Sequence, residues 1–139
     1  MITVQEKDAI ESSYRARLQE LQNQLGMTFP VYVMFTKADL IAGFSEFFDH
    51  LSTEDREQVW GMTFELGNDD DSGAIGQFNK EFHAIINRLT QRLFSRLQFE
   101  HDSENRAAIY EFPRQLRLLQ SAADDFLKEI FAPNPFEKA

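Results

Sequence analysis

The chain of 139 residues carries 14 Lys and Arg against 23 Asp and Glu, which gives a formal net charge of −9 at pH 7. That charge argues against binding to nucleic acid or to an anionic membrane surface, since both favour a basic face. The 42% hydrophobic fraction suffices for one packed domain, and the absence of Cys excludes disulfides and thiolate chemistry. No apolar run approaches the length of a membrane span, so we expect a soluble chain.

The first predicted element is a helix over residues 4–25. Its apolar side chains recur every three or four residues on an otherwise charged segment, at Ile10, Tyr14, Leu18, Leu21 and Leu25. Gly26 supplies a C-terminal stop. We interpret this helix as cover for one face of a sheet and assign no site to it.

An apolar run over residues 30–35 follows and ends abruptly on Thr36-Lys37-Ala38-Asp39. No alternation separates an apolar face from a polar one, so the run predicts a strand that is buried on both sides in a parallel sheet. Open α/β proteins bind ligands beyond the carboxyl ends of such strands. Thr36, Lys37 and Asp39 are therefore candidate ligand-binding residues.

Aromatic side chains at helical spacing come next, and Ser52 predicts the N-cap of a further helix with acids in its first turn, which Gly61 closes. Two interpretations of the aromatic residues stay open. They are either core, as aromatics at this spacing usually are, or an exposed patch on which a partner docks. The candidate docking residues are Phe44, Phe47, Phe48 and Trp60.

A glycine- and aspartate-rich stretch over residues 67–76 partly imitates a calcium-binding loop that starts at Asn68. Asn79 occupies the twelfth position, where that motif requires a bidentate Glu. We therefore interpret the stretch as a solvated surface loop and predict no metal site.

The remaining residues predict a long helix over residues 75–99, a second strand over 107–112 and a last helix to about Phe131 with Pro113 in its first turn. Residues 133–139 are expected to be a frayed tail. Two strands joined by such a helical excursion predict a right-handed crossover with parallel strands. Helices must supply most of the burial, because two strands alone do not make a stable sheet.

The residues from Phe29 to Phe64 resemble the cytoplasmic region of the IcmF/TssM family. The similarity begins with the run Val33-Met34-Phe35-Thr36-Lys37-Ala38-Asp39, is densest over the whole of residues 29–64, and continues more loosely through Ile109-Tyr110-Glu111-Phe112-Pro113 to the end. In that family, the inner-membrane core subunit of type VI secretion systems carries a GTPase-like domain. The resemblance implies a helix-dominated α/β fold, a partial P-loop NTPase-like (small-GTPase-like) structure with two parallel strands and about five helices. Residues 1–139 would be a single-domain fragment of it that lacks the phosphate-loop half.

The resemblance also implies roles for the turn after the first strand. Asp39 would accept hydrogen bonds from a purine base, Lys37 would lie along the base and Thr36 would brace the loop. The alternative is that these residues only cap the strand and the next helix. No G-x-x-x-x-G-K-[ST] motif occurs, so we expect no catalysis and no cofactor in this chain, with GTP or ATP and Mg²⁺ bound only by a full-length protein.

Two functions follow from the resemblance. The chain is either the base-recognition end of a nucleotide-binding domain with a helical docking surface, or a helical protein–protein interaction module that binds no nucleotide. The implied location is the cytoplasmic side of the bacterial inner membrane, with other inner-membrane and baseplate secretion subunits as partners. An unpaired apolar strand edge at residues 31–35 would favour self-association.

Overall fold

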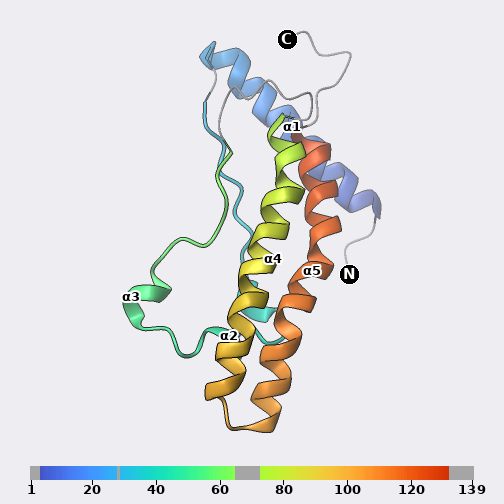
Figure 1. Cartoon of the computed structure of the whole chain (residues 1–139). Helices are drawn as coiled ribbons and strands as arrows, with labels where there is room; N and C mark the ends of the chain where they lie inside the picture. Colours follow the sequence, from blue (N-terminus) through green and yellow to red (C-terminus); the bar gives the residue numbers. More distant parts are fainter. Residues whose placement is uncertain (1–3, 28, 65–72, 132–139) are drawn as a thin grey trace. The chain divides into compact units, whose positions relative to one another are not determined.

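The computed structural model describes residues 4–27, 29–64 and 73–131, and the regular elements in these ranges are all helical (Figure 1). They are α1 (Val4–Leu25), the 3₁₀ turn η1 (Ala38–Leu40), α2 (Phe44–Phe48), α3 (Thr53–Arg56), α4 (Gly73–Phe99) and α5 (Ser103–Phe131). The chain divides into two compact units. The first unit comprises residues 1–34 and 122–139, and the second unit comprises residues 35–121.

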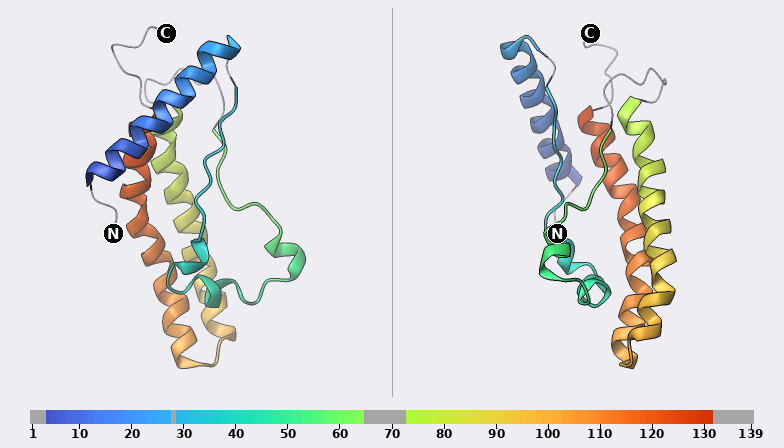
Figure 2. Two further views of the ribbon diagram at one scale, coloured as in Figure 1. Left: turned by 180° about the vertical axis from the view of Figure 1, so that it is seen from behind. Right: turned by 60° about the vertical axis from the view of Figure 1, so that its left-hand side comes forward.

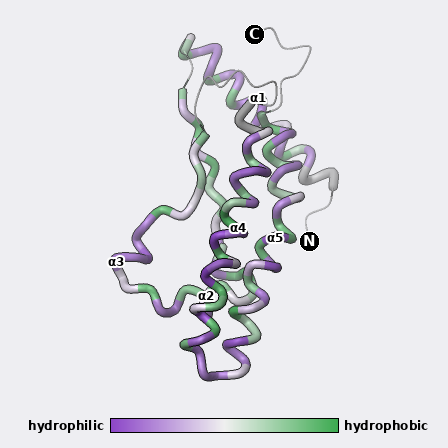
Figure 3. Tube along the Cα trace, viewed as in Figure 1, coloured by the Kyte–Doolittle hydropathy of each residue, from purple (hydrophilic) through white to green (hydrophobic). Residues whose placement is uncertain are grey.

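The expected α/β fold, a partial P-loop NTPase-like sheet with two parallel strands, is wrong, because the described residues form no strand. Residues 31–34 are extended but exposed, with fractions of 44, 89, 42 and 82% for Val31, Tyr32, Val33 and Met34. No backbone hydrogen bond joins residues 29–34 to another described residue. A buried strand needs a neighbour on each side, and none is present in the described part of the chain. Figure 3 shows this segment as hydrophobic despite its exposure.

The second predicted strand, residues 107–112, lies inside helix α5. This helix begins earlier than expected, because the Asp102 carboxylate accepts hydrogen bonds from the backbone N–H groups of Glu104 and Asn105, both at 2.9 Å. Pro113 is therefore inside the helix and not in its first turn. Ile109, Phe112 and Leu116 are buried at helical spacing, so the apolar stripe continues across the proline.

The other predicted helices are present, but α3 is shorter than predicted, because it ends well before Gly61. Helix α1 ends before Gly26, which has a φ of +62° and donates its N–H to Gln22 O at 2.9 Å. The Ser52 Oγ accepts a hydrogen bond from Asp55 N–H at 3.1 Å and caps α3, which ends at Arg56. Helix α4 begins two residues before the predicted start and ends at Phe99. None of the described helices combines the length and apolar character that crossing a membrane requires.

In the second unit, α4 and residues 103–121 of α5 form an antiparallel hairpin, and the segment of residues 35–64 covers one face of it (Figure 2). The core lies between them and is almost entirely aliphatic and aromatic. Its buried side chains are Phe47, Phe78, Phe82, Ile85, Ile86, Leu89, Ile109, Phe112 and Leu116. Burying each such side chain stabilises the fold by roughly 1.5–3 kcal/mol before the loss of conformational entropy.

The first unit contains α1 and the last ten residues of α5, positions 122–131. The Arg15 guanidinium donates a hydrogen bond from Nη1 to the carbonyl oxygen of Glu129 at 2.9 Å, which ties the two helices together. Lys128 and Asp124 form an i,i+4 ion pair with Nζ and Oδ2 2.6 Å apart. Helix α5 is continuous, so it contributes side chains to both units.

Candidate docking surface

Thr36, Lys37 and Asp39 lie in an exposed turn that leads from the extended segment into α2. Lys37 adopts the left-handed conformation, with φ 60° and ψ 34°, and is the N-cap of η1. The Lys37 carbonyl accepts the N–H of Leu40 at 3.1 Å, which closes the turn. Such a conformation costs a non-glycine residue roughly 1–3 kcal/mol, so the surrounding structure must impose it. Because no strand precedes the turn, the expected rim at a sheet edge does not form.

The four candidate docking residues gather with Phe112 of α5 in one aromatic cluster. Phe47 and Phe112, at the centre, are 1% and 0% exposed, and their ring centroids lie 5.1 Å apart. Phe44 and Phe48 are half-buried and contact Phe112 at centroid distances of 5.6 and 5.5 Å, both nearly edge-on. Edge-to-face contacts of this kind add about 0.5–1.5 kcal/mol per pair beyond simple burial. The centre of the cluster is therefore core and cannot itself offer a binding surface.

Trp60 lies on the outside of the same cluster. Its ring is 5.9 Å from Phe48 and 6.4 Å from Phe44 between centroids, and the residue is 46% exposed. The preceding residue, Val59, is 98% exposed. Trp60 is thus held on one side by two phenylalanine rings and is open on the other. A large aromatic side chain in this state is typical of an anchor in a protein interface, because ordering it on binding loses little entropy.

Gly43 lets α2 approach helix α5 closely. Its φ is +81°, and a Cβ atom at this position would lie 2.1 Å from the carbonyl oxygen of Ala108. The residue also precedes α2 as its N-cap. Only glycine meets both conditions, so Gly43 fixes where the aromatic side chains of α2 meet Phe112.

Arg96 of α4 secures the other end of α2. The residue is 8% exposed and donates hydrogen bonds from Nε to Phe47 O at 3.0 Å and from Nη2 to Glu46 O at 2.8 Å. The same Nη2 forms an ion pair with Asp49 Oδ1 at 2.7 Å. A guanidinium at the C-terminus of a helix satisfies carbonyl groups that have no partner within the helix. Arg96 therefore links α2 to α4 through hydrogen bonds and an ion pair.

His50 follows directly after this contact. Partial burial lowers the pKa of the His50 imidazole, and the nearby positive charge of Arg96 lowers the pKa further. The carboxylate of Asp49 acts in the opposite direction. The net direction means that a proton on His50 is disfavoured in the folded state next to the Arg96 guanidinium.

The segment that leads to Trp60 is acidic. Residues 46–57 contain five carboxylates and one basic residue, Arg56, which donates a hydrogen bond to the Asp49 carbonyl at 2.7 Å. Figure 3 shows α3 as a hydrophilic turn, and both views of Figure 2 place it away from the helical hairpin. An apolar anchor beside a polar, charged border matches the anatomy of a protein interface.

Sequence reasoning did not find Gly43, Arg96 or the role of Phe112. A signal existed for Phe112, because the helical spacing from Ile109 to Leu116 continues across Pro113. Gly43 and Arg96 contact backbone atoms that are distant in the sequence, and no local sequence pattern indicates such contacts. The calcium-like stretch that starts at Asn68 lies mostly outside the described residues. Within the described ranges, no three His, Cys, Asp or Glu side chains gather as they would around a metal ion.

The fold and this surface define a helical protein with an aromatic cluster and one partly exposed anchor. The chain belongs to the IcmF-related family, since the model of the IcmF-related N-terminal domain matches residues 3–139. It is also similar to the "Type VI secretion system component TssM1" of Pseudomonas aeruginosa, with 48% identity over 134 residues. That match covers 96% of this chain and 12% of the relative's length. No solved structure matches the chain.

Proposed function

We propose that this chain is a helical docking module of a type VI secretion subunit and that it binds another secretion component through the surface around Trp60. The observation that carries the proposal is the 46% exposed Trp60 ring held against Phe44 and Phe48. Similarity to the Pseudomonas aeruginosa component named above supports the secretion role. A place on the cytoplasmic side of the inner membrane is part of the same proposal.

The test uses the full-length parent protein in its own host, with Trp60→Ala in this region. We expect type VI secretion to fall at least about tenfold, because loss of a central aromatic anchor weakens binding by roughly 2 kcal/mol or more. Co-purification of inner-membrane and baseplate components should fall with it. Phe99→Ala is the matched control, since Phe99 is 75% exposed and belongs to α4. Normal secretion by a fully expressed Trp60→Ala protein would refute the proposal.

Base recognition by Thr36, Lys37 and Asp39 is a second and separate proposal. All three residues are exposed, which makes the site accessible. The left-handed conformation of Lys37 favours an ordered turn at this site. The 139-residue chain and a longer stretch of the parent protein should each be titrated with GTP and ATP in the presence of Mg²⁺. Binding by the longer protein that Asp39→Ala abolishes would support base recognition. Absence of binding by both proteins would reject it in favour of docking alone.

We also propose that the chain self-associates through residues 31–34. Their apolar side chains are exposed, and their backbone groups form no backbone hydrogen bond with another described residue. Both observations support the proposal, because such an extended segment can pair with the same segment of another copy. Sedimentation analysis over a range of concentrations is the test. Val33→Pro should remove a backbone donor and shift any dimer to monomer. A chain that stays monomeric at high concentration would contradict the proposal.

A further inference from the structure

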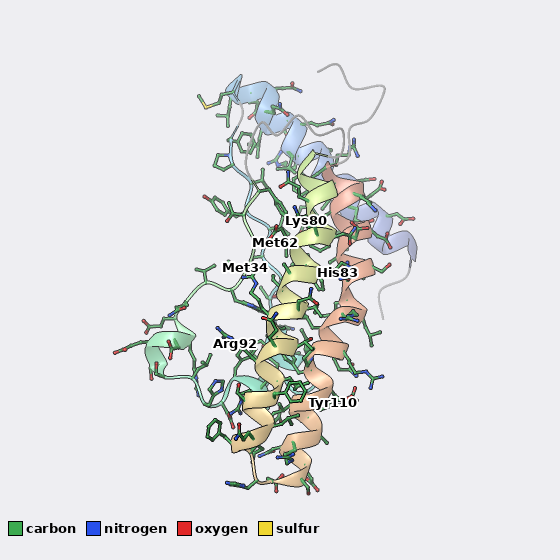
Figure 4. The ribbon with its side chains drawn as sticks, viewed as in Figure 1. Met34, Met62, Lys80, His83, Arg92 and Tyr110 are labelled. Atoms are coloured by element: carbon green, nitrogen blue, oxygen red, sulfur yellow. The ribbon has the colours of Figure 1, made fainter. Side chains whose placement is uncertain are left out.

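The second face of the α4–α5 hairpin in the second unit carries a different kind of surface. The segment of residues 35–64 lies on one face of the hairpin, and no described part of the second unit lies on the opposite face (Figure 2). We call this opposite face the outer face. Every residue of two helical stripes on it is exposed: positions 80, 83, 87, 90 and 94 on α4, and positions 103, 107, 110, 114, 117 and 121 on α5. Figure 4 labels Lys80 and His83 on α4 and Tyr110 on α5.

The outer face is cationic, although the chain as a whole has a charge of −9. Its two stripes contain Lys80, Arg114 and Arg117 and no carboxylate. Arg114 is partly neutralised, because Nη1 lies 3.1 Å from Glu111 Oε1 at the border of the stripe. Lys80 and Arg117 form no ion pair with any residue in the described ranges. These two positive charges are therefore available to an external partner.

Two exposed aromatic residues lie among these cations. Phe94 on α4 is 83% exposed and Tyr110 on α5 is 51% exposed. Large apolar side chains are left open on both helices of the hairpin, on a face that no described residue of the second unit covers. A third helix placed there would bury both rings and complete a three-helix bundle, which is the usual way in which two packed helices bury a second face.

We propose that the outer face docks an acidic amphipathic helix from a partner protein. The apolar side of that helix would contact Phe94 and Tyr110, and its carboxylates would pair with Lys80 and Arg117. Three cations on an acidic chain are too few for nucleic acid or an anionic membrane, which need an extensive basic surface. Another copy docked through the same face would bring like charges together, which disfavours a symmetric dimer. This surface is independent of the docking surface around Trp60.

The probe is a fluorescein-labelled synthetic helix of about 18 residues, long enough to be helical, with Leu on one side and Glu on the other. Its control carries Lys in place of each Glu. Fluorescence anisotropy with the 139-residue chain should show binding of the acidic peptide and at least about tenfold weaker binding of the basic one. Equal binding of both peptides, or no binding of the acidic peptide, would overturn the proposal.

Variants locate the contact. The double variant Lys80→Glu with Arg117→Glu should weaken binding of the acidic peptide at least about tenfold, and Phe94→Ala should weaken it by a similar factor. Arg88→Glu is the matched control, because Arg88 is an exposed cation of α4 outside the stripe, and it should change affinity less than about twofold. Circular dichroism checks that each variant stays folded. Unchanged affinity in the double variant, or a dimer of the chain that this variant dissociates, would overturn the proposal.

Discussion

The two faces of the α4–α5 hairpin in the second unit are built from the same helices but differ in almost every property. The covered face is apolar and includes Phe112, which is fully buried, and Arg96, which is buried and satisfied by backbone carbonyls. The outer face holds cations and two exposed aromatic rings. The comparison shows that, on these two helices, the buried side chains stabilise the fold and the exposed side chains are accessible to a partner.

The largest expected effect comes from removing a buried ring. Phe112→Ala should lower the free energy of unfolding by roughly 3–5 kcal/mol, because the cavity would lie at the centre of the aromatic cluster. Phe94→Ala, which removes the same atoms from the outer face, should change it by less than about 0.5 kcal/mol. Urea denaturation followed by circular dichroism measures both. Equal losses of unfolding free energy in the two variants would show that the two faces do not differ in their contribution to stability.

Gly43→Ala should come next, with a loss of roughly 2–3 kcal/mol. The added Cβ meets the Ala108 carbonyl, and the positive φ adds backbone strain. Gly26→Ala is a good control, because it has a positive φ but no atom within 4 Å of the new Cβ. Thermal or urea unfolding should show the smaller loss for Gly26→Ala. Equal losses of unfolding free energy in the two variants would show that the close approach of α2 to α5 does not contribute to stability.

Arg96→Met keeps most of the side-chain volume and removes the charge and the donors. We expect a loss of about 2 kcal/mol, because two carbonyl groups and the Asp49 carboxylate lose their hydrogen-bond partner. Arg92→Met, at an exposed position four residues earlier in α4, should have little effect. The fluorescence of Trp60 provides a second readout, since a shift in α2 moves the rings that contact it. No change in either measurement would show that Arg96 does not hold α2.

The smallest expected effect is a pH dependence at His50. Its folded-state pKa is lowered, so the unfolded chain binds the proton more readily. Stability from this group is complete above the unfolded value of about 6.5 and declines as the pH falls below it toward the folded-state pKa. His50→Gln should therefore reduce the amount by which the unfolding free energy falls between pH 7.5 and about 5.5. An identical pH profile for the two proteins would contradict the lowered pKa of His50, which burial and the charge of Arg96 produce.

Sequence reasoning predicted the helices that have a long apolar period and a clear start or end signal. The spacing in α1, the stop at Gly26 and the Ser52 N-cap were sufficient for this. The α5 start was missed, because residues 107–112 read equally well as a short strand and Pro113 suggested a helix start. The Asp102 side chain, which caps the true start, was the overlooked signal.

The extended segment at residues 31–34 shows what local sequence does not reveal. Its apolar residues predicted burial, but burial depends on a neighbouring strand, and the described part of the chain supplies none. The candidate surface was predicted in part, because Phe44, Phe47, Phe48 and Trp60 do gather in space. Gly43 and Arg96 determine which of these four side chains faces solvent. The contacts of Arg96 join residues that are 47 or more positions apart in the sequence.

The continuity of α5 has a practical result for limited proteolysis. The chain passes between its two units twice, once at Met34–Phe35 and once between Ser121 and Ala122 within α5. The first crossing is extended and exposed, so a protease can cleave it, whereas the second is protected by helical hydrogen bonds. A single nick there would leave residues 35–139 as one polypeptide that still contains part of both units. The cleaved N-terminal piece would stay attached only through noncovalent contacts such as that of Arg15 with Glu129.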